Sequence, residues 1–104
     1  MDKRTRISFI HSPDAFLAET QQYGAMFMPV WAYTLAAYVE HPERYDMKLF
    51  DMRFDSVENI PEADLFVFSG VNQDYETIVE THRRIREQHP ESVFVLGGPI
   101  AWSL

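Results

Sequence analysis

The most informative absence in this sequence of 104 residues is cysteine, of which there is none. Without cysteine the chain has no disulfide, no thiolate nucleophile and no ligand for an iron–sulfur cluster. It also has no apolar run near the length of about 20 residues that spans a bilayer. Its N-terminus, MDKRTRISFI, lacks the long apolar stretch of a signal peptide. We therefore expect a cytoplasmic protein that does not cross a membrane.

Positive charge is scarce as well. Nine lysine and arginine residues are outnumbered by 16 aspartate and glutamate residues, which gives a net charge of −7. Nonspecific nucleic-acid binding depends on a basic surface, so the composition argues against it. The apolar fraction of 46% is that of a globular protein. At this length we expect one domain over residues 1–104, burying about 65% of the surface of the unfolded chain.

Four apolar runs of strand length are spaced along the chain. They occupy residues 6–10, 47–51, 64–69 and 92–97. The last two, DLFVFS and SVFVLG, are almost uninterrupted by polar residues. Such runs are typical of parallel strands buried on both faces.

Two helices are predicted between these strands. The first begins at Pro29, which suits the first helical position, and ends near His41-Pro42 because the residue before proline avoids helical geometry. The second can be capped by Asp74 and is stopped by Pro90. Its apolar stripe consists of Tyr75, Ile78, Val79, His82 and Ile85.

The alternation of strands and helices predicts an α/β fold. We expect a flavodoxin-like or Rossmann-like three-layer sandwich, with a parallel sheet in the strand order 2-1-3-4. Doubly wound domains usually carry a fifth strand. We therefore expect the chain to be the N-terminal part of a longer protein, truncated before that strand.

Ligands of open parallel sheets bind beyond the carboxyl ends of the strands. The loops expected there begin with HSPDAF, DMRFD, SGVNQDY and GGPIAW. Small residues in the third and fourth loops, Ser69-Gly70 and Gly97-Gly98, leave the backbone accessible to a ligand, although glycine suits any strand-to-helix turn. Neither loop matches a Walker loop or GxGxxG. His11 is the one histidine expected at the carboxyl end of a strand.

Asp51 at a strand end suggests the phosphoacceptor of a receiver-like domain. That chemistry needs an acidic pair after the first strand to bind Mg²⁺, and only Asp14 follows that strand here. It also needs a lysine at a later strand end, and the chain has none beyond Lys48. We set this hypothesis aside. No pair of histidines has metal-ligand spacing either, so a zinc site is not expected.

Four segments in order, MPVWAYTLAAYVE, LFDMRF, DLFVFSGVNQDYETIVETHRRIRE and VFVLGGPIAWSL, resemble the N-terminal cobalamin-binding domain of radical SAM enzymes. The resemblance spans roughly residues 5 to 104 and rests on the ordered set, because no single piece is specific. The helix entry PVWAY departs from the P-P-L-G form of the family. The resemblance implies a Rossmann-like domain that binds cobalamin across the carboxyl ends of its strands.

Cobalamin domains such as that of methionine synthase carry D-x-H-x-x-G after the second strand, and this histidine ligates cobalt. In the corresponding run of this chain, Asp51 is followed by Arg53, and Ser56 replaces the glycine. A guanidinium has no free lone pair and cannot ligate cobalt. The resemblance therefore implies cobalamin binding without a histidine from this loop, as is common in the radical SAM branch.

The same carry-over assigns the remaining loops. Ser69 and Val71 match the family's S-x-[LTV] element, the paired glycines make room for the nucleotide tail between the third and fourth loops, and Asp51 with Arg53 would contact corrin amides or the phosphate. The candidate cofactor-binding set is His11, Asp51, Arg53, Phe54, Ser69, Gly70, Val71, Asn72, Gly97, Gly98 and Pro99. No catalytic residue and no protein metal ligand is predicted.

The resemblance also implies a partner, the radical SAM domain of the same polypeptide. That domain would hold the 4Fe-4S cluster and S-adenosylmethionine, because this chain has no cysteine. Two alternatives stay open. One is a flavodoxin-like domain that binds FMN or another small anionic ligand at the same loops. The other is a noncatalytic interaction domain in which the edge strand VFVL pairs with a second copy or another partner.

Overall fold

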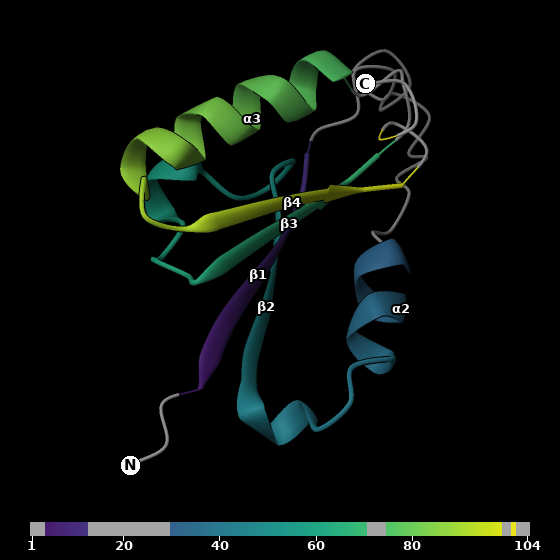
Figure 1. The fold of residues 1–104 in the computed structure, drawn as a ribbon. Coiled ribbons are helices and arrows are strands. Elements are labelled where there is room, and N and C mark those ends of the chain that lie inside the picture. The colour runs from purple at the N-terminus through teal and green to yellow at the C-terminus, as the bar shows by residue number, and fades with distance from the viewer. Residues whose placement is uncertain (1–3, 13–29, 71–74, 99–100, 102–104) are drawn as a thin grey trace.

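The computed structural model describes residues 4–12, 30–70, 75–98 and 101. Its centre is a parallel sheet in the order β2-β1-β3-β4. The strands are β1 (Thr5–His11), β2 (Tyr45–Asp51), β3 (Leu65–Ser69) and β4 (Val93–Gly97). Helices α2 (Val30–Ala37) and α3 (Tyr75–Gln88) lie on opposite sides of the sheet (Figure 1). The predicted α/β fold, with parallel strands in the order 2-1-3-4, is confirmed.

The α3 face of the sheet holds the larger core. Phe66 is fully buried at its centre, where its ring stacks on Phe94 with ring centroids 5.4 Å apart. Ile78 and Ile85 pack from α3 onto these rings, and Ile10 joins them from β1. The short 3₁₀ helix η3 (Val57–Asn59) and the residues after it close the far side of this core. Of the apolar stripe predicted for the second helix, Ile78 and Ile85 are buried, whereas Tyr75 and Val79 are exposed.

The opposite face is covered by α2 and is less complete. Ala32 is buried against Ile7 and Phe9, and Trp31 meets Phe9 edge to face at 6.1 Å between ring centroids. Apolar side chains also occupy the outer side of α2, where Tyr33 is 55% exposed. α2 therefore covers β1 and its neighbours but leaves apolar surface on both sides of itself.

β1, and not β4, is the strand that is buried on both faces. Residues 7–10 of β1 are all buried, as expected for a strand with a neighbour on each side. In β4, by contrast, Val93 and Val95 on the α2 face are 59% and 43% exposed. The apolar composition of β4 predicts burial, but the sheet places this strand at an edge that α2 does not reach.

The first helix is shorter than predicted. α2 ends at Ala37, and the amides of Tyr38 and Val39 donate hydrogen bonds three residues back, to the carbonyls of Leu35 and Ala36. These bonds reach back three residues, as in a 3₁₀ helix, so the helix ends before it reaches Pro42, which was predicted to end it. His41 then takes a left-handed conformation (φ 56°) ahead of η2 (Pro42–Arg44).

The second helix agrees with its prediction, since α3 ends at Gln88 shortly before the proline at position 90. The predicted helix starts at Pro29 and Asp74 lie outside the described residues. In the part of the chain that the structure describes, no helix has the length and apolar character needed to cross a bilayer.

Candidate functional site

The carboxyl ends of the four strands meet at one edge of the sheet. In the strand register His11 lies beside Asp51, and Ser69 lies beside Gly97. Four of the predicted site residues are therefore brought to a common edge by the sheet itself. Val71, Asn72 and Pro99, which belong to the same predicted set, lie outside the described residues.

Asp51 and Arg53 form a bidentate ion pair at this edge. The guanidinium donates from Nε to Oδ1 at 2.9 Å and from Nη2 to Oδ2 at 2.6 Å. The backbone N–H of Arg53 donates to the same carboxylate at 3.1 Å. The side chains of Arg53 and Asp51 are only 5% and 16% exposed. The side chain of Arg53 thus turns back towards the aspartate at the strand end and neutralises its charge.

The electrostatics of Asp51 reflect two opposing effects. Burial raises the pKa of its carboxyl group, because a buried carboxylate loses hydration. The hydrogen bonds and the positive charge of Arg53 outweigh this, and the pKa of Asp51 is lowered overall. The pair is therefore ionised at neutral pH, and its two charges cancel within the site.

The rest of the second loop folds around this pair. The backbone N–H of Asp51 donates to the carboxylate of Asp55 at 2.9 Å, and the amides of Phe54 and Asp55 both donate to the carbonyl of Asp51. Phe54 points outward and is 71% exposed, with the Arg53 guanidinium 5.6 Å from its ring centre. Polar groups of the loop thus form hydrogen bonds with one another. The loop exposes the aromatic ring of Phe54, whereas the guanidinium of Arg53 is buried.

The imidazole of His11, at the end of β1, is held in place by Trp31 of α2, the helix that connects β1 to β2. The indole N–H of Trp31 donates to Nδ1 of His11 at 3.1 Å. An indole nitrogen can only donate, so Nδ1 must be the acceptor and the proton of the neutral imidazole lies on Nε2. In this arrangement neither ring nitrogen offers a lone pair for a metal, because one accepts a hydrogen bond and the other carries hydrogen.

Next to these residues a groove runs between α2 and the carboxyl ends of β3 and β4. Its volume is about 450 Å³. Trp31 forms part of one wall and Ser69 and Gly97 form part of the other; no charged side chain lines it. The complete lining is Val30, Trp31, Thr34, Leu35, Val67, Phe68, Ser69, Val95, Gly97 and Gly98. Trp31 therefore joins the His11 end of the site to the groove.

The two adjacent glycines at the end of β4 have different surroundings. Gly98 has a φ of +84°, and a Cβ atom there would lie 2.6 Å from the hydroxyl oxygen of Ser69 and 3.2 Å from the carbonyl oxygen of Gly70. A side chain at Gly97 would meet nothing within 4 Å. Gly98 thus lets the third and fourth loops touch, whereas Gly97 leaves space on the groove side.

Sequence reasoning identified the strand-end residues but did not place Trp31 among the candidate site residues. The signal that could have found it is its indole N–H, which needs an acceptor when the ring is half-buried. It could not have named His11 as that acceptor. Among the described residues, no three His, Cys, Asp or Glu side chains gather as a metal site would require.

Comparison with known proteins adds no family to these observations. No protein-family model, no curated protein and no solved structure matches this chain.

Proposed function

We propose that this chain is a cobalamin-binding module of a radical SAM enzyme, with the corrin over the carboxyl edge of the sheet. The observation that carries the proposal is the groove between α2 and the ends of β3 and β4. It brings together Ser69 and the Gly97-Gly98 pair, the elements that the family resemblance assigns to the nucleotide tail. These two elements are distant in sequence, and their shared groove is independent of the resemblance that singled them out.

The chemistry of the groove fits an aromatic base. Its volume of about 450 Å³ lies within the usual range for small-molecule sites, about 300–1,000 Å³. Its walls are mostly apolar, and Thr34 and Ser69 are the hydroxyl-bearing residues among its lining. Gly97 leaves open space where a side chain would intrude. Because Gly98 lies against the third loop, the tail is proposed to lie in the groove beside the two turns and not between them.

The chemistry of Arg53 and His11 bears on whether either residue could ligate the cobalt of the corrin. Arg53 has no lone pair, and its guanidinium is engaged by Asp51. Nδ1 of His11 accepts the Trp31 hydrogen bond. Cobalamin, when bound, would supply group-transfer chemistry at cobalt. The protein's own residues would hold the tail, exclude water from the groove and leave cobalt without a ligand from Arg53 or from Nδ1 of His11.

The alternative of an FMN site is less well supported. A phosphate at a strand edge is usually bound by a cation or by converging N–H groups. No charged side chain lines the groove, and the guanidinium of Arg53, at the same edge of the sheet, is neutralised by Asp51. The same features favour a ligand that inserts an apolar part over one that inserts a charged part.

The test is retention of hydroxocobalamin after desalting, read from the visible spectrum. The matched variants are Gly97→Leu, which fills the groove, and Val93→Leu, which adds bulk on the same face of β4 outside the groove. We expect coloured protein for the wild type and for Val93→Leu, and at least about tenfold weaker binding for Gly97→Leu. A colourless wild-type fraction, or stabilisation by FMN in place of cobalamin, would overturn the proposal.

A further inference from the structure

Ser12, directly after β1, buries a hydroxyl for which the described residues supply no hydrogen-bond partner. The residue is 7% exposed, and its Oγ makes no hydrogen bond within the part of the chain that the structure describes. Such groups are rare in folded proteins, because a buried polar atom loses its hydration and gains nothing in return. The candidate site residues taken from the sequence include His11 but not Ser12. Folding alone does not explain this buried hydroxyl.

The sheet places Ser12 where the chain connections diverge. β1 is joined through α2 to β2, and β3 is joined through α3 to β4, with the two helices on opposite faces of the sheet (Figure 1). β1 and β3 are neighbours, and their last paired residues are Ile10 and Phe68. Ser12 follows this pair by two residues on one strand, as Gly70 does on the other. In open parallel sheets, ligands bind in the crevice at this switch in strand order.

Ser12 follows the strand that lies between the two parts of the site. On one side of β1, His11 is paired with Asp51, and the carbonyl of His11 accepts a hydrogen bond from the N–H of Met52 at 2.9 Å. On the other side is β3, whose last residue, Ser69, lines the groove. Ser12 does not line the groove itself. Its hydroxyl is therefore near the middle of the carboxyl edge, between the ion pair and the groove.

The chemistry of this edge favours a neutral polar group as the partner of Ser12. A serine hydroxyl can donate one hydrogen bond and can also accept hydrogen bonds. A carboxamide does both, through its N–H and its carbonyl oxygen. A carboxylate or a phosphate is bound best by a cation. The guanidinium of Arg53, at this edge, is already engaged by Asp51.

We propose that Ser12 is a ligand-binding residue of the carboxyl edge, and that its hydroxyl forms a hydrogen bond with a peripheral carboxamide of the corrin. The inference rests on the proposed function, because it names a contact within that same site. A buried hydroxyl has lost its hydration when the chain folds, so its bond to a ligand replaces no bond to water. Such a residue strengthens binding while it lowers the stability of the free protein.

Ser12→Ala should therefore affect stability and binding differently. The free variant loses no hydrogen bond, so its melting temperature should stay within about 2 °C of the wild-type value or rise. Its dissociation constant for hydroxocobalamin, titrated by visible absorbance, should be about tenfold larger. A fall of several degrees with unchanged binding would mean that the hydroxyl already has a partner in the free protein, and would overturn the proposal.

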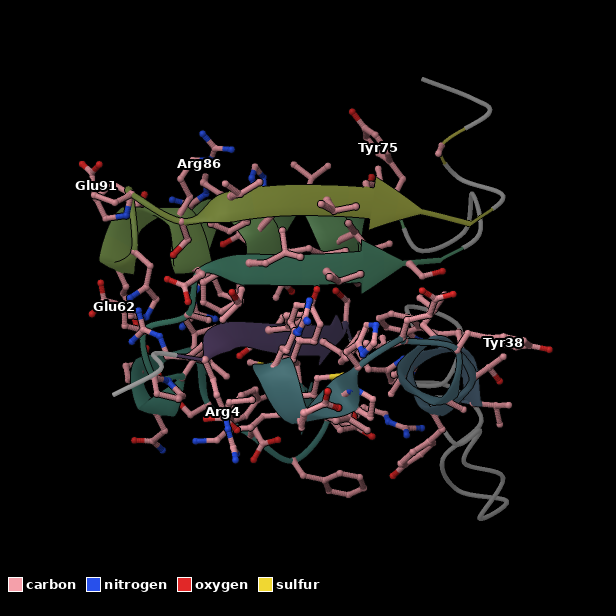
Figure 2. All side chains as sticks on the ribbon, turned by 60° about the horizontal axis from the view of Figure 1, so that its bottom comes forward. Arg4, Tyr38, Glu62, Tyr75, Arg86 and Glu91 are labelled. Carbon is pink, nitrogen blue, oxygen red and sulfur yellow. The ribbon has the colours of Figure 1, made fainter. Side chains whose placement is uncertain are left out.

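The matched control is Ser92→Ala, at the opposite end of the sheet. The hydroxyl of Ser92 donates to the carbonyl of Ala63 at 2.5 Å. In Figure 2 the arrows of β1, β3 and β4 point towards the end where Tyr75 lies, whereas Glu62 and Glu91, which precede these two residues in the sequence, lie near the amino ends. Ser92→Ala should lower the melting temperature by about 4–8 °C and leave cobalamin binding unchanged.

A second pair of variants separates the hydroxyl from the size of the side chain. Ser12→Thr and Ser12→Val introduce side chains of similar shape, and only threonine keeps the hydroxyl. The threonine variant should bind hydroxocobalamin about tenfold more tightly than the valine variant. Equal binding by both, when the wild type binds, would overturn the role of Ser12 and leave the proposed function in place. A wild-type protein that stays colourless would overturn the proposed function, and this contact with it.

Discussion

The two faces of the sheet are built from similar residues but are closed to different degrees. On the α3 face, Phe66 is wholly buried and its neighbours fill the space around it. On the α2 face, Val95 keeps 43% of its surface exposed and a groove separates it from the helix. The strands supply apolar side chains to both faces, so composition does not cause this difference. The coverage by the helices does.

The comparison separates residues that hold the fold from residues that are free to bind. A closed face gains stability from every buried contact, and a substitution there leaves a cavity. An open face has apolar surface that no helix covers, which is what a ligand or a second chain can use. We therefore expect substitutions on the α3 face to change mainly the free energy of unfolding, and substitutions on the α2 face to change mainly binding.

The largest expected effect is that of Phe66→Ala. Removing a buried ring that stacks on Phe94 should lower the free energy of unfolding by about 3–5 kcal/mol. Leu35→Ala, at an exposed position on α2 that borders the groove, should lower it by less than about 1 kcal/mol. Urea unfolding followed by circular dichroism measures both values. Similar losses for the two variants would mean that the α2 face is as tightly packed as the α3 face.

Next in size is Asp51→Asn, which breaks the ion pair at the carboxyl edge. The substitution leaves the buried guanidinium of Arg53 without its countercharge, and we expect a loss of about 2 kcal/mol at neutral pH. The double variant Asp51→Asn with Arg53→Met removes both charges and should recover much of the loss. A double variant as unstable as Asp51→Asn would contradict this account.

The same pair predicts how stability changes in acid. The pKa of Asp51 is lowered in the folded protein, so the unfolded chain, with a carboxyl pKa of about 3.9, binds a proton first. The stabilisation is therefore complete above about pH 4 and is lost as the pH falls through the lowered pKa. Asp51→Asn should flatten this acid limb of the unfolding curve. An unchanged limb would assign acid sensitivity to other carboxylates.

Substitutions at the two adjacent glycines at the end of β4 should differ in how much stability they cost, as substitutions on the two faces of the sheet do. Gly98→Ala forces a Cβ atom against the third loop at a positive φ, and we expect it to cost about 1–2 kcal/mol. Gly97→Ala points into open space and should change stability by no more than about 0.5 kcal/mol. Thermal unfolding of both variants measures this. Equal losses would show that the groove beside Gly97 is filled.

The strands and their order could be predicted because they depend on local patterns. Apolar runs of strand length, separated by helical periodicity, place each strand within about two residues of where the structure has it. Right-handed crossovers then leave few arrangements of the sheet. The exposure of β4 could not be predicted in this way, because it depends on which strands α2 covers. α2 packs through Ala32 on Ile7 and Phe9 of β1, and β4 lies two strands away at the edge of the sheet.

The site was predicted less completely than the fold. The rule that ligands bind at carboxyl ends of strands located His11, Asp51 and Ser69 correctly at one edge. The direction of the Arg53 side chain could not be read from the sequence, since an arginine at that position can point outward or turn back to Asp51. The bond between Trp31 and His11 was equally hidden, because it joins residues 20 positions apart.

The smallest predicted effect is a pH dependence on the α3 face. Burial lowers the pKa of His82, and the charge of Arg86 lowers it further. An unfolded histidine has a pKa of about 6.5, so below that pH the unfolded chain binds a proton before the folded protein does. The contribution of His82 to the free energy of unfolding should therefore be fully present above about pH 6.5. It should fall slightly as the pH decreases through the lowered pKa.

Unfolding curves measured between about pH 7 and about pH 5, where histidine titrates, should reveal this slope. His82→Gln removes the titrating ring and should make the slope shallower. His41→Gln, which removes an exposed histidine beside η2 instead of one on the α3 face, is the control. A slope that survives in His82→Gln would mean that protonation at His82 is tolerated where Phe68 and Phe94 enclose it. In that case the α3 face would be less tightly closed around its histidine than the burial of Phe66 suggests.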